Sequence, residues 1–412
     1  MRVLLLSQFF NPEPTLKGLA FARALQRQGL DVEVLTGYPN YPGGRLYPGY
    51  RRRLWSREVI EGVVVNRVWL YPSHDRSALR RIGNYVSFAL TAAIFGPWRV
   101  RRPEAIYVHH PPPTIAWPAG VLRAVTGAKF IYEIQDIWPD TLAATGMLSN
   151  PTLLAIIGRW CKRIYRRADH LVVISPGFRD LLVERGVPSA KVDLVYNWCD
   201  EDRLVPSPRD PVMARSLGIG DGFIVMFAGT LGLAQGLDTV LDTAELCRVR
   251  VPNARFVFVG DGVERARLQA SAAARNLTNI DFVARQPLER MGPVLALADA
   301  LLVHLKDDPL FAITVPSKTQ AYLRVGIPIV MAVRGDGADL VARSGGGITC
   351  PPEDPERLAD AVLSLASRSP EERAAMGAAG RRFYERELSL DTGSARYAAL
   401  FRSLRLTTRR SA

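Results

Sequence analysis

The sequence predicts an α/β protein with two doubly wound, Rossmann-like domains. Short apolar runs alternate with segments of helical period along nearly all of the 412 residues. This alternation is typical of parallel sheets that are covered by helices on both faces. The polar stretch 199–215 interrupts the pattern once, with three prolines. The segment 223–262 reads as a complete βαβ unit with glycines after both of its strands.

In the first half, the run 2–7 has the continuous apolar character of a strand that is buried on both faces. A polar loop with two prolines follows, and then a helix over 18–28 that Gly29 ends. A hairpin is expected around Glu61 and Gly62. The other strands of this half are expected at 31–36, 104–109, 129–134 and 170–174.

In the second half, the hinge is placed in the polar stretch, and alternation then resumes. The chain is expected to form a first domain of residues 1–200, a second of 201–385 and a C-terminal helix of 386–412 that packs back on the first domain. Two such domains that face one another leave a cleft between their strand ends. The strands of the second half are expected at 223–228, 255–260, 279–283, 300–304, 327–331 and 347–350.

Composition and charge exclude several classes of protein. Hydrophobic residues make up 48% and charged residues 23% of the chain, as in an ordinary soluble protein. The formal net charge of +13, with arginine clusters such as 51–53 and 99–102, indicates an anionic partner. The four cysteines are far apart in the sequence and read as free thiols. With no metal-binding motif and a strand at the first residue, we expect a cytoplasmic protein without a metal site or signal peptide.

The uncharged segment 82–98 lies between arginine clusters. It is slightly short for a membrane-spanning helix, and three polar residues weaken that assignment. One interpretation is a helix in the membrane interface, with the arginines on anionic lipid and Trp98 at the headgroups. The other is a buried crossover helix of the first sheet.

Glycines at the ends of two predicted strands mark a candidate anion site. Gly229 and Gly232 follow the strand 223–228, and Gly260 ends the next strand. Glycine in these places lets backbone N–H groups approach an anionic ligand, and the helix behind adds the positive end of its dipole. The spacing differs from the dinucleotide fingerprint. The pattern therefore favours a nucleotide or sugar-nucleotide site.

Polar residues follow other strand ends. His109 and His110 end the strand 104–109, and a neutral imidazole can hydrogen-bond hydroxyl groups or relay a proton. Strand-end packing explains either histidine equally well. Asp136 and Trp138 follow the next strand, and a carboxylate beside an indole suits sugar recognition.

Three further residues are candidates on the second domain. Lys318 follows Ser317 at a predicted helix start, where the serine can cap the helix and the lysine adds a charge. Asp261 and Arg285 follow strand ends and are candidates for contacts to a nucleotide base or ribose and to its phosphates. Each of the two is also an ordinary turn residue.

Several long motifs are more specific. They include NPEPTLKG, LTGYPNYPGG, VHHPPPT, YEIQDIWPDTLAATGM, FAGTLGLAQGLD and VPSKTQAYLRVGIPIV. Over nearly the whole chain these motifs resemble retaining glycosyltransferase family 4, whose members have the GT-B fold. They are most similar to a bacterial subgroup that builds surface polysaccharides and includes N-acetylfucosaminyl transferases of capsule, O-antigen and colanic-acid clusters.

The resemblance implies a reaction and its partners. A sugar would move from a nucleoside diphosphate to an acceptor with retained anomeric configuration, without a metal or other cofactor. Backbone N–H groups and fixed cations would then stabilise the leaving diphosphate. We expect a UDP-linked N-acetylated deoxyhexosamine as donor and a polyprenyl-diphosphate sugar as acceptor. The enzyme would lie on the inner face of the plasma membrane and would bind no nucleic acid.

The resemblance also implies roles for particular residues. It places Lys17 and Gly18 near the donor diphosphate, and one of the two histidines, His109 or His110, against the transferring sugar. It assigns a loop to the acceptor side, with the residues Tyr38, Asn40 and Tyr41.

The sequence departs from the family pattern at two places. Thr230 and Gln235 stand where family members commonly carry cations, so a neutral bond from Thr230 would replace a charge-assisted one. A pair of glutamates is also missing, since Ile313 and Ala321 occupy those positions. The ribose contact of the second glutamate is therefore unassigned, with the candidates Gln320 and Tyr322.

Two alternatives remain open at this point. One is a sugar-nucleotide 2-epimerase with the same fold, which would work without an acceptor. The other is a non-catalytic binder of anionic ligands or nucleic acid, which would need basic residues interleaved with aromatic ones. The basic clusters lie beside apolar helices instead, and this favours lipid.

Overall fold

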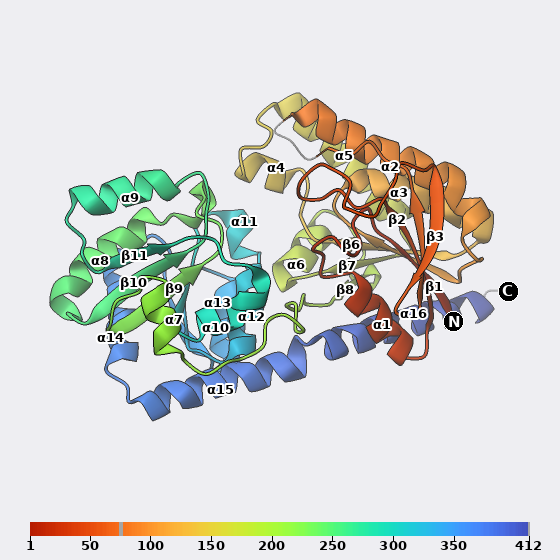
Figure 1. The fold of residues 1–412 in the computed structure, drawn as a ribbon. Helices are drawn as coiled ribbons and strands as arrows, with labels where there is room; N and C mark the ends of the chain where they lie inside the picture. The colour runs from red at the N-terminus through yellow and green to blue at the C-terminus, as the bar shows by residue number, and fades with distance from the viewer. Residues whose placement is uncertain (74–76, 411–412) are drawn as a thin grey trace. The chain divides into compact units, whose positions relative to one another are not determined.

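The computed structural model describes residues 1–73 and 77–410. This part of the chain forms two compact units (Figure 1): unit 1 is Met1–Tyr196 with the chain from Leu390 onward, and unit 2 is Asn197–Ser389. Each unit is a sheet of mainly parallel strands with helices on both faces. The predicted fold class of two doubly wound α/β domains is therefore confirmed.

The described strands of unit 1 form one sheet in the order β3-β4-β2-β1-β5-β6-β7-β8. All neighbours are parallel except β3 and β4, which form the predicted hairpin with Glu61 at a positive φ of 47°. The short edge strand β8 was not predicted, because it has three residues of which only Val192 is buried. The strands are β1 (Arg2–Leu6), β2 (Asp31–Gly37), β3 (Trp55–Ile60), β4 (Val63–Val68), β5 (Ala105–His109), β6 (Lys129–Ile134), β7 (His170–Val173) and β8 (Val192–Leu194).

The helices of unit 1 cover its sheet, and the last of them comes from the far end of the chain. In Figure 1, α16 lies beside α1. The helices are α1 (Leu19–Arg27), α2 (Ala78–Arg99), η1 (Pro113–Ile115), α3 (Ala116–Thr126), α4 (Asp140–Ala144), α5 (Pro151–Arg167), α6 (Pro176–Glu184), η2 (Ser189–Lys191) and α16 (Leu390–Arg410).

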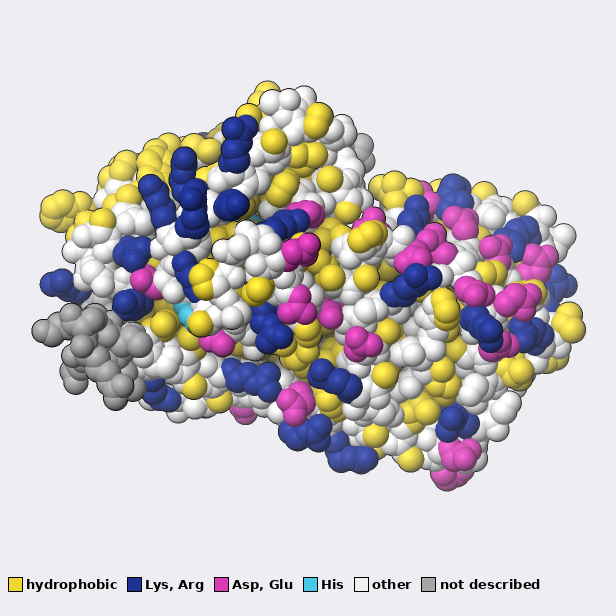
Figure 2. All heavy atoms as spheres, turned by 180° about the vertical axis from the view of Figure 1, so that it is seen from behind, with side chains coloured by type: hydrophobic (Ala, Val, Ile, Leu, Met, Phe, Trp, Pro, Cys, Tyr) yellow, Lys and Arg dark blue, Asp and Glu magenta, His cyan; other side chains and the backbone are white. Residues whose placement is uncertain are grey.

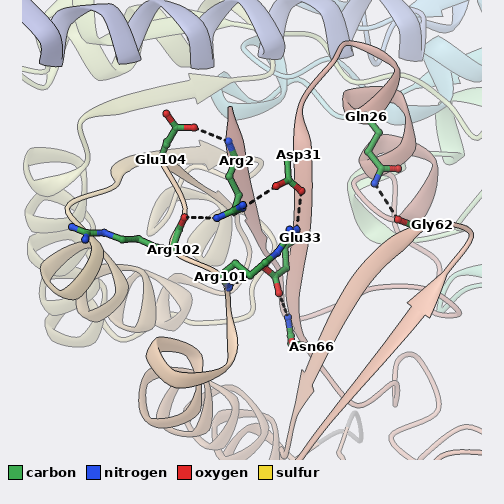
Figure 3. A network of polar contacts seen from close by, with 9 residues as sticks. All are labelled: Arg2, Gln26, Asp31, Glu33, Gly62, Asn66, Arg101, Arg102 and Glu104. Carbon is green, nitrogen blue, oxygen red and sulfur yellow. Dashed lines mark hydrogen bonds and ion pairs between the residues drawn. The ribbon is translucent and has the colours of Figure 1, made fainter.

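Charged side chains join the amino ends of β1 and β2 (Figure 3). Arg2 and Arg101 both donate to the carboxylate of Asp31, at 2.9 and 2.8 Å. Glu33 is buried and accepts from the side-chain nitrogen of Asn66 and the backbone nitrogen of Arg101, both at 2.9 Å. Because a buried carboxylate is costly without partners, this network favours one register at the end of the sheet away from its carboxyl edge.

The uncharged segment 82–98 lies within α2, and its two sides differ. Phe88, Ala89 and Ala92 are buried, as the crossover interpretation predicts. Ile82 and Trp98 are 53% and 84% exposed. None of the helices in the described part of the chain combines the length and apolarity that crossing a membrane requires.

Unit 2 has a parallel sheet in the order β11-β10-β9-β12-β13-β14 across its described strands. This is the doubly wound order in which the chain runs outward from β9 in one direction and then from β12 in the other. The strands are β9 (Phe223–Ala228), β10 (Ala254–Val259), β11 (Ile280–Val283), β12 (Ala300–His304), β13 (Ile329–Ala332) and β14 (Gly347–Cys350).

The core of unit 2 lies between its sheet and the helices that pack on it. Phe227, Phe258 and Leu302 are each 1% exposed in this core, and Leu241 and Val362 are fully buried. The helices are α7 (Pro211–Ser216), η3 (Leu233–Gln235), α8 (Asp238–Arg250), α9 (Arg265–Ala274), η4 (Leu288–Arg290), α10 (Met291–Leu295), α11 (Pro309–Ala312), α12 (Ser317–Val325), α13 (Asp336–Ser344), α14 (Pro355–Ala366) and α15 (Pro370–Glu387).

Candidate functional site

The strand order of each unit identifies the place where a ligand is expected to bind. Open α/β sheets bind ligands outside the carboxyl ends of the two strands from which the chain runs in opposite directions. In unit 2 these strands are β9 and β12, and in unit 1 they are β1 and β5. The predicted glycine loop follows β9, and the two histidines come at the end of β5.

The glycines of unit 2 allow two loops to touch. A Cβ on Gly260 would lie 1.9 Å from the carbonyl oxygen of Gly229, and one on Gly262 would lie 2.2 Å from that of Leu231. Gly229 and Gly260 also have φ angles of 144° and 149°, which side chains rarely adopt. These glycines therefore bring the ends of β9 and β10 together and leave the backbone of Gly229 exposed.

The rest of the glycine loop is held by its own side chains. The backbone N–H of Gly232 donates to Oε1 of Gln235 at 3.0 Å, so Gln235 closes the loop where family members commonly carry a cation. Nδ1 of His304 lies 2.6 Å from the carbonyl oxygen of Gln235, and Nε2 accepts from the backbone N–H of Glu353. Burial lowers the pKa of His304, so a neutral imidazole supports the loop from below. Sequence reasoning missed His304, although a histidine that ends a buried strand is a signal.

Lys318 lies directly beneath this loop. Its Nζ atom is buried and has no hydrogen-bond partner within the described part of the chain. The ammonium lies 3.4 Å from the centre of the Phe227 ring, and 3.1 Å from the position of a Cβ on Gly229. Burial lowers the pKa of Lys318 to about 7. An unpaired buried cation is costly, so the site is set up to gain from an anion above Gly229.

The other candidates on α12 differ from expectation. Ser317 is exposed, but the residue before the helix is Pro316 and no side chain caps it. The amide nitrogen of Gln320 is placed to donate to the carbonyl oxygens of Pro316 and Ser317. Tyr322 is 1% exposed, and its hydroxyl bridges the N–H and the carbonyl of Ala228, at 2.9 and 3.1 Å. Gln320 and Tyr322 thus hold the helix and β9 in place, where a ribose contact was expected.

Three exposed residues of unit 2 follow the ends of β9, β10 and β11. Thr230 and Arg285 are exposed and have no hydrogen-bond or ion-pair partner among the described residues. Asp261 accepts from the N–H of Gly262 at 2.8 Å, which is the turn interaction. All three side chains remain accessible to a ligand.

In unit 1, a buried carboxylate lies behind the switch point. Glu133, on β6, is fully buried, and Nζ of Lys17 lies 3.3 Å from its Oε1. Nδ1 of His109 lies 2.7 Å from its Oε2, and the hydroxyls of Tyr107 and Tyr397 also donate to it. Burial alone raises the pKa of Glu133, but the charge of Lys17 and these hydrogen bonds lower it below its ordinary value.

This cluster changes the expected role of Lys17. Its side chain is fully buried and its ammonium contacts the rings of Phe21 and Tyr397, in place of the donor contact that the resemblance implies. Burial lowers the pKa of Lys17 to about 8, against the attraction of Glu133. The neighbouring Gly18 starts α1, and a Cβ there would lie 2.3 Å from the side-chain oxygen of Asn11.

The two histidines are in different surroundings. His110 is 2% exposed and packs against Tyr132 and Trp138, and burial lowers its pKa to about 3. His109 keeps 14% of its side chain exposed, with one ring nitrogen on Glu133. Of the two, His109 is therefore the one that can meet a ligand, through Nε2.

Asp136 and Trp138 follow β6 on the same edge of the sheet. Burial raises the pKa of Asp136, while the nearby His109 opposes the shift. Asp140, in the first turn of α4, forms a bidentate ion pair with Arg185 at 2.7 and 2.9 Å.

The acceptor-side loop is organised by a buried carboxylate. Glu13 accepts from the backbone N–H groups of Asn40 and Tyr41, both at 2.7 Å. Asn40 is 1% exposed and donates to the carbonyl of Tyr38, which is 3% exposed. Tyr38 and Asn40 therefore shape the loop from inside, and Tyr41 is half-buried beside them. Across the residues that the structure describes, no group of three or more His, Cys, Asp or Glu side chains is arranged to hold a metal ion.

Comparisons with known proteins agree with this organisation. Residues 19–198 match the model of a glycosyl transferase 4-like domain, and residues 211–383 that of glycosyl transferases group 1. The probable glycosyltransferase WbjE of Pseudomonas aeruginosa is 28% identical over 65% of this chain and 68% of its own length. The putative colanic acid biosynthesis glycosyl transferase WcaI of Escherichia coli K12 is 27% identical over 79% of this chain and 82% of its own.

Solved structures show the same fold at low identity. Sucrose-phosphate synthase from Thermosynechococcus elongatus superposes with a TM-score of 0.71 at 16% identity, covering 98% of this chain and 99% of that one. Anabaena HepE in complex with UDP-glucose has a TM-score of 0.69 at 14% identity, covering 98% and 100%. The predicted GT-B fold class is thereby confirmed.

Proposed function

Because the chain belongs to the GT4 family of glycosyltransferases, we propose that it transfers a sugar from UDP to a lipid-linked acceptor with retained configuration. The donor sugar is an N-acetylated deoxyhexosamine, and the acceptor is a polyprenyl-diphosphate sugar of a surface polysaccharide such as O-antigen or capsule. Two similar proteins support this choice of donor and of pathway. Anabaena HepE was solved with UDP-glucose, and WcaI is described as a colanic acid biosynthesis enzyme.

The donor half of the proposal rests on the buried ammonium of Lys318, which has no hydrogen-bond partner among the described residues. It lies under the exposed backbone of Gly229, at the edge of the sheet where an anion is expected to bind. A diphosphate bound there gains a charge-assisted contact from Lys318. Thr230, within the loop, and Arg285, after β11, are exposed and add donors in this scheme.

The same contacts favour the transition state. As the bond between the anomeric carbon and the diphosphate oxygen breaks, negative charge grows on that oxygen and positive charge on the sugar ring. Fixed donors that face the developing charge stabilise it more than the intact donor. In this scheme Lys318 supplies the positive charge that a metal ion supplies in other transferases. The acceptor oxygen bonds to the anomeric carbon on the face that the diphosphate leaves.

Unit 1 supplies the acceptor side. In this scheme Nδ1 of His109 donates to the Glu133 carboxylate, so Nε2 can accept a hydrogen bond from a sugar hydroxyl. The proton of the acceptor hydroxyl passes to the departing diphosphate, which leaves as UDP. Asp136, beside His109, orients the acceptor hydroxyl. We place the enzyme at the cytoplasmic face of the inner membrane, where such acceptors are presented.

The test begins with thermal unfolding of the full chain in the presence of UDP, GDP and ADP, with EDTA throughout. We expect UDP to raise the unfolding temperature most, because binding to the native state alone stabilises it. Transfer is then followed with UDP-N-acetylhexosamines and a polyprenyl-diphosphate sugar, and the product's anomeric configuration is read by NMR. Inverted configuration, or a rate that EDTA abolishes, would contradict the proposed mechanism.

A further inference from the structure

Unit 1 has a large apolar groove that the reaction chemistry does not use. It has a volume of about 960 Å³ and lies between α2, α3 and α5. Its walls include Trp117 and Val121 of α3, Val86 of α2 and Trp160 of α5. A site of this size and apolarity suits a small organic ligand. Thr114, which also lines the groove, follows His109 closely in the chain.

The surface around the groove is also apolar. On α2 the large side chains Ile82, Val86, Leu90, Ile94 and Trp98 recur at four-residue steps and are between 39% and 84% exposed. Trp117 is 52% and Trp160 is 37% exposed. Large apolar side chains that are exposed in such number on one part of a soluble protein indicate an interaction site. Figure 2 shows hydrophobic side chains with Lys and Arg beside them on the part of unit 1 at the upper left.

Positive charge beside the groove indicates that its ligand has an anionic group. α5 carries five basic residues and no acidic one. Arg163 and Arg167 line the groove, and neither has an ion-pair partner within the described part of the chain. Arg123, which also lines it, is paired with Asp169 at 2.9 Å. A ligand with an apolar chain and an anionic group would therefore match both features. A second copy of this chain would not, because its own α5 brings the same positive charge.

We propose that the groove binds the isoprenoid chain of the acceptor lipid, with Arg163 and Arg167 on its phosphate groups. This inference rests on the proposed function, since it concerns the acceptor of that reaction. The new element is that one particular groove of unit 1 holds the hydrocarbon chain of that acceptor. The exposed row on α2 would continue this apolar path into the membrane interface.

Gly120 offers a direct test of the groove. It lines the groove, and a Cβ there would meet no atom within 4 Å. Gly120→Leu therefore fills the groove while replacing a poor helix former by a good one in α3. The control is Ala155→Leu, which adds a similar apolar side chain at an exposed position of α5 that does not line the groove.

Binding of farnesyl phosphate is measured by calorimetry on the full chain, with saturating UDP so that the site of unit 2 is filled. Inorganic phosphate is the probe without a chain. We expect wild-type and Ala155→Leu protein to bind farnesyl phosphate more tightly than phosphate, and Gly120→Leu to lose about tenfold or more in affinity. Equal affinity of wild-type and Gly120→Leu protein, or equal affinity for the two probes, overturns the proposal.

The outcome stays separate from that of the proposed function. An unchanged thermal shift with UDP shows that Gly120→Leu protein is folded and binds donor. Farnesyl phosphate binding that Gly120→Leu weakens, without transfer to any polyprenyl acceptor, would refute the proposed reaction and keep the groove. Transfer to a long-chain acceptor with the same KM in wild-type and Gly120→Leu protein would refute the groove and keep the reaction.

Discussion

Replacing Lys318 by methionine should stabilise the ligand-free protein and abolish its response to the donor. Methionine has a similar length and shape but carries no charge, so it fills the same space between the loop and Phe227. In the wild-type protein this space holds an ammonium group without a hydrogen-bond partner in the described structure. The Lys318 ammonium thus destabilises the ligand-free native state, and it makes a favourable interaction only when an anion binds.

The pKa of Lys318 sets the size of the effect. A fall from 10.5 to about 7 corresponds to about 5 kcal/mol in favour of the neutral form. The Phe227 ring, 3.4 Å from the ammonium, offsets up to about 2 kcal/mol, which leaves about 3 kcal/mol. Because the folded-state pKa is lowered, the wild-type protein gains stability as pH rises above 7. The advantage of Lys318→Met should therefore be largest at pH 6 and shrink by about 2 kcal/mol towards pH 9.

Calorimetric unfolding of both proteins between pH 6 and 9 measures this difference. For a domain the size of unit 2, about 3 kcal/mol is roughly 6 to 12 °C in unfolding temperature. Lys306→Met is the matched control, since Lys306 is an exposed lysine of the same unit and its loss should change stability by less than about 0.5 kcal/mol. UDP should raise the unfolding temperature of wild-type protein but not of Lys318→Met. A variant that is no more stable at pH 6, or a difference that pH leaves unchanged, would refute the reasoning.

Three further variants test the supports of the two sites. Glu133→Gln leaves Lys17 buried without its carboxylate and should destabilise unit 1 by about 3–5 kcal/mol in calorimetric scans. The loss of stability should be larger at pH 6 than at pH 9, and equal losses at both pH values would contradict the ion pair. Tyr397→Phe should cost about 1–3 kcal/mol in the same scans, the value of one hydrogen bond to a charged group. Gly260→Ala should abolish UDP binding by calorimetry because its Cβ meets a carbonyl oxygen at 1.9 Å, whereas Gly43→Ala, with open space around it, should bind as wild type.

The strands were predictable because their physical cause is local. β9 and β12 are continuous apolar runs that parallel sheets require, and both begin and end where the pattern predicts. The edge strand β8 has one buried residue and so leaves no apolar run in the sequence. The different exposure of the two sides of α2 was harder to predict, because a segment without charges gives the same sequence pattern whether its second side is buried or exposed.

At the site, the sequence did not predict which side chains point into the protein and which point towards a ligand. Gln320 and Tyr322 were considered as ribose contacts, yet both lie on the inner side of α12 with Thr319 and Leu323. Glu133 was overlooked because it is one residue within an apolar strand. A charged residue in such a strand is itself a signal, since glutamate is almost never fully buried unless it is paired. Its partner Tyr397 comes from α16, which no local pattern relates to β6.

The two lysines whose ammonium groups are buried show why pairing, more than burial, distinguishes a structural cation from one that awaits a ligand. Lys17 and Lys318 each stand beside a glycine or a serine at the start of a helix, after the loop at a strand end. Lys17 has a carboxylate 3.3 Å away, so an anionic ligand would have to compete with Glu133 for it. Among the residues that the structure describes, the ammonium of Lys318 has only the ring of Phe227 beside it, which a diphosphate need not displace. Glu133 therefore offsets part of the cost of burying the Lys17 ammonium within unit 1, whereas the cost of burying the Lys318 ammonium is offset only when an anion binds.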